Sequence, residues 1–176
     1  MPVVAQSRVS PQVSVSHGSL GFGSSAITER EQIERQDVWE FDLYQSYFSK
    51  YVKDLLLRPT FDKAEQKLKE MAKIAPNWDS YGAQPPNPEA RACAAEILTL
   101  LQGQAFPPST IVPSSEGGVA ICFVDSGAYA DIECLNTGEV LAVTYEGNAE
   151  PHVWDVGRKD TAIKSAIEQI REHFSA

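Results

Sequence analysis

The sequence has no long basic run, no long apolar segment and no cysteine motif, and each absence excludes a class of function. Fifteen Lys and Arg residues stand against 24 Asp and Glu residues, which gives a formal net charge of −9. That charge disfavours non-specific binding to a nucleic-acid backbone or to an anionic membrane. No apolar stretch approaches the ~18 residues that a transmembrane helix needs, so we expect no membrane partner.

The three cysteines, Cys93, Cys122 and Cys134, form no C-x-x-C pair and have no histidine at the spacing of a zinc site. The first ten residues, MPVVAQSRVS, lack the charged start and the apolar core of a secretory signal. We therefore expect a cytoplasmic protein with reduced thiols, and neither a metal ion nor another cofactor.

The short motifs of common enzyme classes are missing as well. The sequence contains no G-x-S-x-G elbow, Walker A loop, G-x-G-x-x-G segment or H-E-x-x-H pair. Two weaker combinations remain as an alternative, enzymatic interpretation. His152 and Asp155 are close in the sequence, but a third converging metal ligand is not evident. Asp131 and Glu133 fall about 7 Å apart on one strand face, which suits acid–base chemistry but is more typical of a solvated surface.

Residues 1–27 are rich in Ser, Gly and Val and carry almost no charge. Such a segment cannot bury enough apolar surface to fold alone. The composition predicts a tail that is either flexible or ordered by a partner, followed by a single domain over residues 28–176. In the second case Val9, Val13 and Val15 could add a strand to an exposed sheet edge.

Apolar residues at steps of three and four predict three helices between residues 28 and 103. The first carries aromatic residues from Phe41 to Tyr51, and Pro59 is expected to end it. The second follows Thr60, and the third begins at Asn87, which is a suitable N-cap before Pro88.

The period changes to two after residue 109, which predicts a sheet within residues 109–157. Three strands are expected at 119–125, 128–135 and 139–146, with a further edge strand at 109–113. A final amphipathic helix is predicted over residues 160–174. The fold class is therefore α+β: an antiparallel three- to four-stranded β-meander covered by helices, with a helical N-terminal half and one C-terminal helix.

The turns also predict a register for the strands. A two-residue turn at Ser126-Gly127 pairs Phe123 with Ala130, and it places Cys122 and Cys134 on opposite faces, where they cannot form a disulfide. A two-residue turn at Thr137-Gly138 pairs Ile132 with Val143 and puts Val143 and Leu141 on the core face. The register shifted by one residue would place these two apolar residues beside Asp131 and Glu133, which disfavours it.

The segment NWDSYGAQPPNPEA, residues 77–90, places Trp78 and Tyr81 in a proline-rich connector between two helices. Two interpretations remain open. Trp78 could fill space between a helix and the sheet, with Gly82 supplying a positive-φ turn. Alternatively, the two aromatic residues could be a binding loop, because recognition residues are often found on loops.

The same segment, followed by STIVPSSEGGVAICF, resembles a widespread group of small bacterial proteins. These share an N-W-D-x-Y/E-G-A-x-P segment and a later V-P-x-x-x-G-G-V strand entry. The similarity spans roughly residues 75–146 and implies a bacterial or phage origin and an α-then-β layout, with no activity or catalytic residue to transfer. The meander followed by one helix is also similar to the layout of HicB-type antitoxins.

These observations predict a non-enzymatic protein-binding module, such as an antitoxin, an inhibitor or an accessory subunit of a bacterial defence or mobile-element system. The expected partner is another protein, for instance the product of a neighbouring gene, and self-association is a second option. The candidate binding residues are Val9, Val13, Val15, Trp39, Phe41, Tyr47, Trp78 and Tyr81. Direct nucleic-acid binding has only one local source of support, the four lysines Lys63, Lys67, Lys69 and Lys73.

Overall fold

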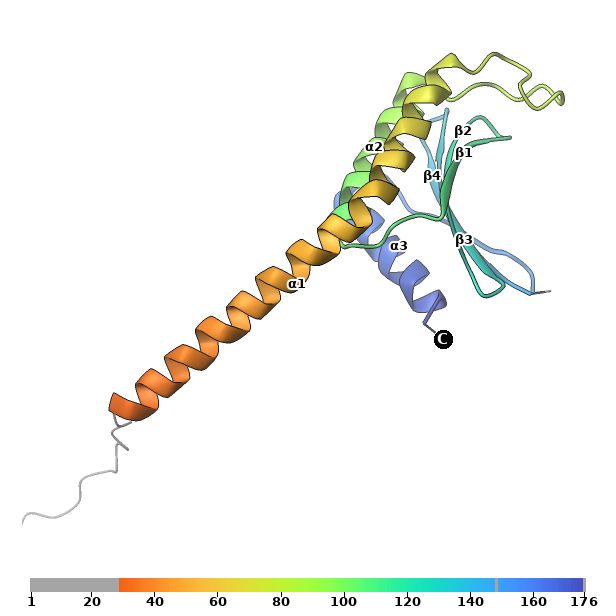
Figure 1. Ribbon diagram of the computed structural model, residues 1–176. Coiled ribbons are helices and arrows are strands. Elements are labelled where there is room, and N and C mark those ends of the chain that lie inside the picture. Colours follow the sequence, from red (N-terminus) through yellow and green to blue (C-terminus); the bar gives the residue numbers. More distant parts are fainter. Residues whose placement is uncertain (1–28, 148, 176) are drawn as a thin grey trace, which may run out of the picture. The chain divides into compact units, whose positions relative to one another are not determined.

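A computed structural model describes residues 29–147 and 149–175, with side chains from residue 45 onward. The chain divides into two units, Met1–Asp42 and Leu43–Ala176. Of the first unit, the structure describes residues 29–42, which form the beginning of a helix. The second unit contains the sheet and the remaining helices (Figure 1). The predicted α+β class is confirmed, although the sheet has five strands where three to four were expected.

Helix α1 spans Glu29–Glu70 and is followed by a 3₁₀ turn at Met71–Lys73. The prediction that Pro59 separates two helices is wrong, because Pro59 lies inside α1. A proline inside a helix has no N–H to donate to the carbonyl four residues earlier, which is that of Leu55. The side chains of Leu55 and Leu56 are exposed there, so water can reach the helix surface and hydrate the freed carbonyl.

Helix α2 spans Pro88–Gly103 and begins as the sequence predicts. The side chain of Asn87 caps it by accepting a hydrogen bond from the N–H of Ala90 at 2.8 Å. Asn87 also bonds to Asn136 in two ways. Its N–H donates to Asn136 Oδ1 at 2.7 Å, and its Nδ2 donates to the Asn136 carbonyl at 2.9 Å. The start of α2 is thereby fastened to a turn of the sheet.

The sheet is an antiparallel meander in the order β1-β2-β3-β4-β5. Its strands are β1 Thr110–Ser114, β2 Gly118–Asp125, β3 Ala128–Leu135, β4 Val140–Glu146 and β5 His152–Asp155. Strand β5 has only four residues and follows Pro151, which explains why the two-residue period did not reveal it. Pro113 lies in β1, an edge strand that pairs only with β2 in the sheet, where a residue without an N–H is tolerated.

The first hairpin has the predicted register, with Phe123 opposite Ala130. The predicted register of the second hairpin is wrong by one residue. Ile132 lies opposite Ala142, and Val143 lies opposite Asp131. The cause is a three-residue turn, Asn136-Thr137-Gly138, in which Gly138 has a φ of 91° and flanking Leu135 donates to the Glu139 carbonyl at 2.9 Å. Such a turn shifts β4 by one position relative to a two-residue turn and so reverses its faces.

One face of the sheet packs against helices and forms the hydrophobic core. Helix α3, Asp160–His173, contributes a buried stripe of isoleucines, as predicted. The second half of α1 contributes Phe61, Ala64 and Leu68, and the following 3₁₀ turn contributes Met71. The strands contribute the other side of the core: Ile111, Val119, Ile121, Phe123, Ala130, Ile132, Cys134, Val140 and Ala142.

Candidate functional site

The opposite face of the sheet forms a broad surface whose centre no described helix covers; in Figure 1, α2 and α3 both lie on the core side, and α1 reaches the edge of this surface through the hydrogen bond from Lys67 to Thr110. We call this surface the open face. By strand register it consists of Thr110, Val112, Ser114, Ala120, Cys122, Val124, Tyr129, Asp131, Glu133, Leu141, Val143, Tyr145, Val153 and Asp155. Val124 and Val153 keep 56% and 54% of their side-chain surface exposed. The open face therefore combines an apolar rim with two carboxylic acids.

Asp131 lies near the middle of the open face and is only 7% exposed. Its Oδ2 accepts a hydrogen bond from the Tyr129 hydroxyl at 2.7 Å. Its Oδ1 is buried and has no hydrogen-bond partner among the described residues. Burial raises the pKa of the Asp131 carboxyl above its ordinary value, and the hydrogen bond from Tyr129 offsets part of this rise. A buried oxygen without a donor is unfavourable for the fold.

Glu133 follows on the same side of β3. Its Oε1 accepts a hydrogen bond from the Ser114 hydroxyl at 3.0 Å. Burial, and then the charge of Asp131, raise the pKa of Glu133 above its ordinary value. Among the described residues, no ion pair involves either carboxylate. The open face thus holds two neighbouring acids without a cationic partner.

Sequence reasoning placed Leu141 and Val143 in the core and therefore missed the open face. In the structure Leu141 lies opposite Glu133, and Val143 lies opposite Asp131. The hydrophobic pattern had disfavoured this register. One signal in the sequence could have identified the correct register. Asn136-Thr137-Gly138 also fits a three-residue turn with glycine in the left-handed position, and a choice between turn lengths decides the faces of β4.

A second exposed apolar surface lies on α1. We call it the α1 stripe: Tyr47, Phe48, Tyr51, Leu55 and Leu56, all of them exposed. Tyr47, a predicted binding residue, is 67% exposed. Trp39 and Phe41 belong to α1, but their side chains lie outside the described residues. Val9, Val13 and Val15 lie outside the described residues altogether.

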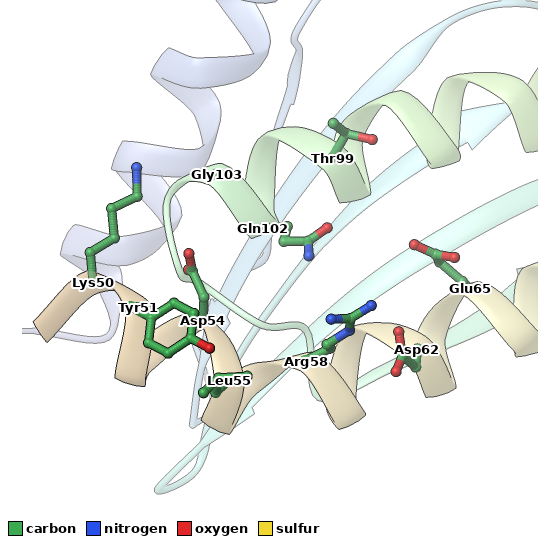
Figure 2. A pocket seen from close by; sticks show the side chains of 10 residues that line it. All are labelled: Lys50, Tyr51, Asp54, Leu55, Arg58, Asp62, Glu65, Thr99, Gln102 and Gly103. Atoms are coloured by element: carbon green, nitrogen blue, oxygen red, sulfur yellow. The ribbon is translucent and has the colours of Figure 1, made fainter. Parts of the chain in front are cut away.

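Beside this stripe, α1 and the C-terminal end of α2 enclose a groove of about 640 Å³. Figure 2 shows Tyr51 and Leu55 on its α1 side and Gln102 on its α2 side. Lys50 and Arg58 lie along the same side as Tyr51. The groove combines apolar side chains of α1 with charged side chains of the same helix and with polar residues of α2, and an amphipathic helix binds to apolar and charged groups of this kind.

The connector that contains Trp78 and Tyr81 is held by its own hydrogen bonds. Asp79 Oδ1 accepts from the N–H groups of Tyr81 at 2.8 Å and Ala83 at 3.1 Å. These bonds lower the pKa of Asp79. Asn77 Oδ1 accepts from the N–H of Gly82 at 2.8 Å. The local network fixes the loop without the help of the tryptophan.

The two aromatic side chains of this loop point outward. Tyr81 is 94% exposed, and Trp78 is 38% exposed and lies outside the hydrophobic core. The interpretation of Trp78 as a plug between helix and sheet is therefore wrong. Asn77 and Ser80 have positive φ angles of 62° and 67°, which Asx-type turns tolerate. The loop thus displays its aromatic residues on a backbone with few alternative conformations.

The residues of the enzymatic interpretation do not converge. His152 and Asp155 are three positions apart on β5, so they point to opposite faces of the sheet. The His152 ring stacks on Trp154 with 5.1 Å between centroids, and Asp155 accepts from the N–H of Gly157 at 2.8 Å. Within residues 29–147 and 149–175 no group of three or more His, Cys, Asp or Glu side chains is placed to hold a metal ion.

The four lysines of the nucleic-acid interpretation do not form one surface. Lys63 and Lys67 are a helical turn apart on α1, whereas Lys69 and Lys73 fall on another side of the helix axis. Lys67 Nζ donates to Thr110 Oγ1 at 2.7 Å, and Lys69 pairs with Glu65 at 3.7 Å. Two of the four are thus engaged with neighbouring side chains.

The cysteines are free thiols in the structure. Cys93 of α2 and Cys134 of β3 share a hydrogen bond in the core, and this bond together with burial raises the pKa of Cys134. Cys122 lies on the open face, so the prediction that Cys122 and Cys134 occupy opposite faces is confirmed. Burial raises the pKa of Cys122 as well.

None of the helices in the described residues combines the length and the apolar character required to cross a membrane. The chain was also compared with protein-family models, with curated proteins and with solved structures, and it matches none of them. Its function must therefore be inferred from its own surfaces.

Proposed function

We propose that the chain is a non-enzymatic module that binds a basic partner protein through the open face. The observation that carries this proposal is the buried Oδ1 of Asp131, which has no hydrogen-bond partner in the centre of a sheet face that no described helix covers. The hydrogen bond from Tyr129 satisfies Oδ2 alone, so the burial of Oδ1 carries a desolvation cost that an apolar side chain at the same position would avoid.

A partner's Lys or Arg would supply what Asp131 lacks. Charge-assisted hydrogen bonds to a carboxylate are among the strongest in proteins, and their strength increases away from water. The surrounding valines, Val124 and Val153, are more than half exposed and would exclude water from the contact. By register, the neighbours of Asp131 on its own face are side chains such as Tyr129 and Val143, and in the proposed complex these side chains would rotate to admit the cation.

The net charge of the whole chain indicates that the partner at the open face is a basic protein and not a second copy of this chain. A protein with a net charge of −9 attracts a basic surface and increases the rate of its association. Two open faces brought together would place Asp131 and Glu133 against the same two acids, which is repulsive. An antitoxin, an inhibitor and an accessory subunit all fit this description, and we propose that the protein belongs to this group.

The test is capture of the partner from the source cells with full-length chain, identification by mass spectrometry, and reconstitution from purified proteins. We expect the reconstituted complex to weaken with salt and to lose at least about tenfold in affinity with Asp131→Asn, as expected for removal of one member of a charge pair. Val153→Glu should have a similar effect because it places a further acid on the rim.

The matched control is Asp125→Asn, which removes the same charge from an exposed position on β2, two residues beyond Phe123 of the core face. This variant should bind like the wild type. Equal affinity of wild type, Asp131→Asn and Val153→Glu would overturn the proposal, and so would binding that does not depend on salt.

A further inference from the structure

The charges of α1 are segregated along its length. Residues 29–42 contain six acidic and two basic residues, whereas residues 43–58 contain three basic and one acidic residue. The two stretches are adjacent in the same helix, Glu29–Glu70. Such an arrangement is self-complementary only if the helix meets a copy of itself that runs in the opposite direction.

The apolar residues of α1 have the spacing of a helix-pairing seam. Phe41, Tyr44, Phe48, Tyr51 and Leu55 follow one another at steps of three, four, three and four residues. This is the heptad pattern in which one side of a helix packs against another helix. Where the structure describes the side chains of this seam, they are exposed: Tyr51 and Leu55 retain 62% and 49% of their surface. The folded unit therefore leaves this part of the seam uncovered.

We infer that α1 pairs antiparallel with α1 of a second copy of this chain, centred near Tyr44. In this arrangement the acidic stretch 29–42 of one copy lies along the basic stretch 43–58 of the other, and the same contact occurs twice by two-fold symmetry. A parallel pair would place the two acidic stretches together. The paired segment of 30 residues would extend over about 45 Å.

The groove between α1 and α2 fits the same occupant. Tyr51 and Leu55 line it together with Lys50 and Arg58. The incoming stretch of the second copy is acidic and carries Trp39 and Phe41. In the register centred on Tyr44, its Asp37 and its Glu29 and Glu31 would meet Lys50 and Arg58 respectively, while its Phe41 would lie against Tyr47. This pairing gives a role to the predicted residues Trp39, Phe41 and Tyr47 that the open face does not provide.

The first test is sedimentation equilibrium of the full-length chain over a range of micromolar concentrations. We expect a monomer–dimer equilibrium that shifts toward monomer as salt is added, because the pairing charges are at the surface. Tyr51→Glu should weaken the dimer at least about tenfold by placing an acid in the seam beside the acidic stretch of the other copy. The control Val124→Glu adds the same charge on the open face and should leave the dimer unchanged. Circular dichroism verifies that both variants retain the fold.

The second test determines the direction of pairing. Asp37 and Tyr51 lie seven residues on either side of Tyr44, and both follow the three- and four-residue steps of the seam. Under mild oxidation, chains with Asp37→Cys mixed with chains with Tyr51→Cys should form mixed disulfide-linked dimers, whereas Asp37→Cys chains alone should not link to each other. The wild type, whose three thiols are buried, is the background control.

A monomer at every concentration would overturn the inference, and linkage of Asp37→Cys chains to each other would overturn the antiparallel direction. Asp131→Asn should not affect the dimer, because Asp131 lies on the open face and not on α1. If the chain proved to be monomeric, the proposed binding of a basic partner would therefore be unaffected. Likewise, if no basic partner were found, the proposed dimer would be unaffected.

Discussion

The core face and the open face belong to the same five strands but differ in what their side chains do. The core face is filled by aliphatic residues such as Val119, Ile121 and Ile132, none of which is exposed. The open face carries valines at its rim and acids at its centre, and one buried oxygen of Asp131 has no hydrogen-bond partner among the described residues. The comparison teaches that one side of the sheet consists of groups whose burial stabilises the fold, whereas the other contains a group whose burial is unfavourable for it.

The largest effect is expected from one substitution made on both faces. Val119→Ala removes a fully buried side chain and should lower the free energy of unfolding by about 2–3 kcal/mol, from lost apolar burial and the cavity that remains. Val153→Ala is the matched control on the open face, where the side chain is half exposed, and it should change the value by less than about 0.5 kcal/mol. Urea denaturation measures both. Equal losses would show that the open face is packed as tightly as the core.

The next largest effect is expected on the pH dependence of stability, from a substitution of Asp131 on the open face. The raised pKa of this carboxyl means that the folded state holds its proton more tightly than the unfolded state does, so stability falls as pH rises above the ordinary value of 3.8. Asp131→Asn removes this dependence. The variant should be more stable than wild type at neutral pH by about 1–2 kcal/mol, and this advantage should disappear as the pH is lowered through the range of the raised pKa.

Thermal unfolding followed by circular dichroism at several pH values gives the difference between the two proteins directly. Glu133, whose pKa is also raised, contributes to the profile of both proteins. The part of its rise that burial causes cancels in the difference, and the part that the Asp131 charge causes is removed together with that charge in the Asn variant. A destabilised Asn variant at neutral pH would show that the Asp131 carboxylate supports the fold, and it would remove the stability argument for a binding role.

The smallest effect is expected from loss of the contact between Asn87 and the turn 136–138. This turn determines which residues of β4 face the core. Asn87→Ala removes the cap of α2 and the hydrogen bond from Nδ2 to the Asn136 carbonyl, and should cost about 1 kcal/mol. Faster amide exchange in the turn 136–138 and in β4 than in β2 would show that the connection fixes this hairpin. Equal amide exchange rates in all strands would instead indicate that Asn87 acts only as the cap of α2.

Local signals were sufficient to predict most of the fold. The cap at Asn87, the isoleucine stripe of α3 and the two-residue turn at Ser126-Gly127 each act over a few residues, and each was confirmed. The register of β4 required information from elsewhere. The turn 136–138 is held by Asn87, which lies 49 residues from Asn136 in the sequence, and no local pattern contains that contact.

The site was harder to predict for the same reason. Tyr47, Trp78 and Tyr81 were predicted as binding residues from residue type alone; all three are exposed, and their binding stays a prediction. The unpartnered position of Asp131 could not be recognised, because it depends on which residues of β4 lie beside it and on whether a helix covers the face. The effect of Pro59 was misjudged because local preference disfavours a proline inside a helix, whereas the exposure of the preceding turn makes it tolerable.

The two edges of the sheet have a consequence for the behaviour of the protein at high concentration. Fibril growth and edge-to-edge aggregation require an outer strand with a continuous row of free backbone donors and acceptors. Strand β1 interrupts that row with Pro113, and β5 provides only four residues. The two edges of the sheet therefore offer little backbone to an added strand, even though the described helices leave one broad face of the sheet uncovered.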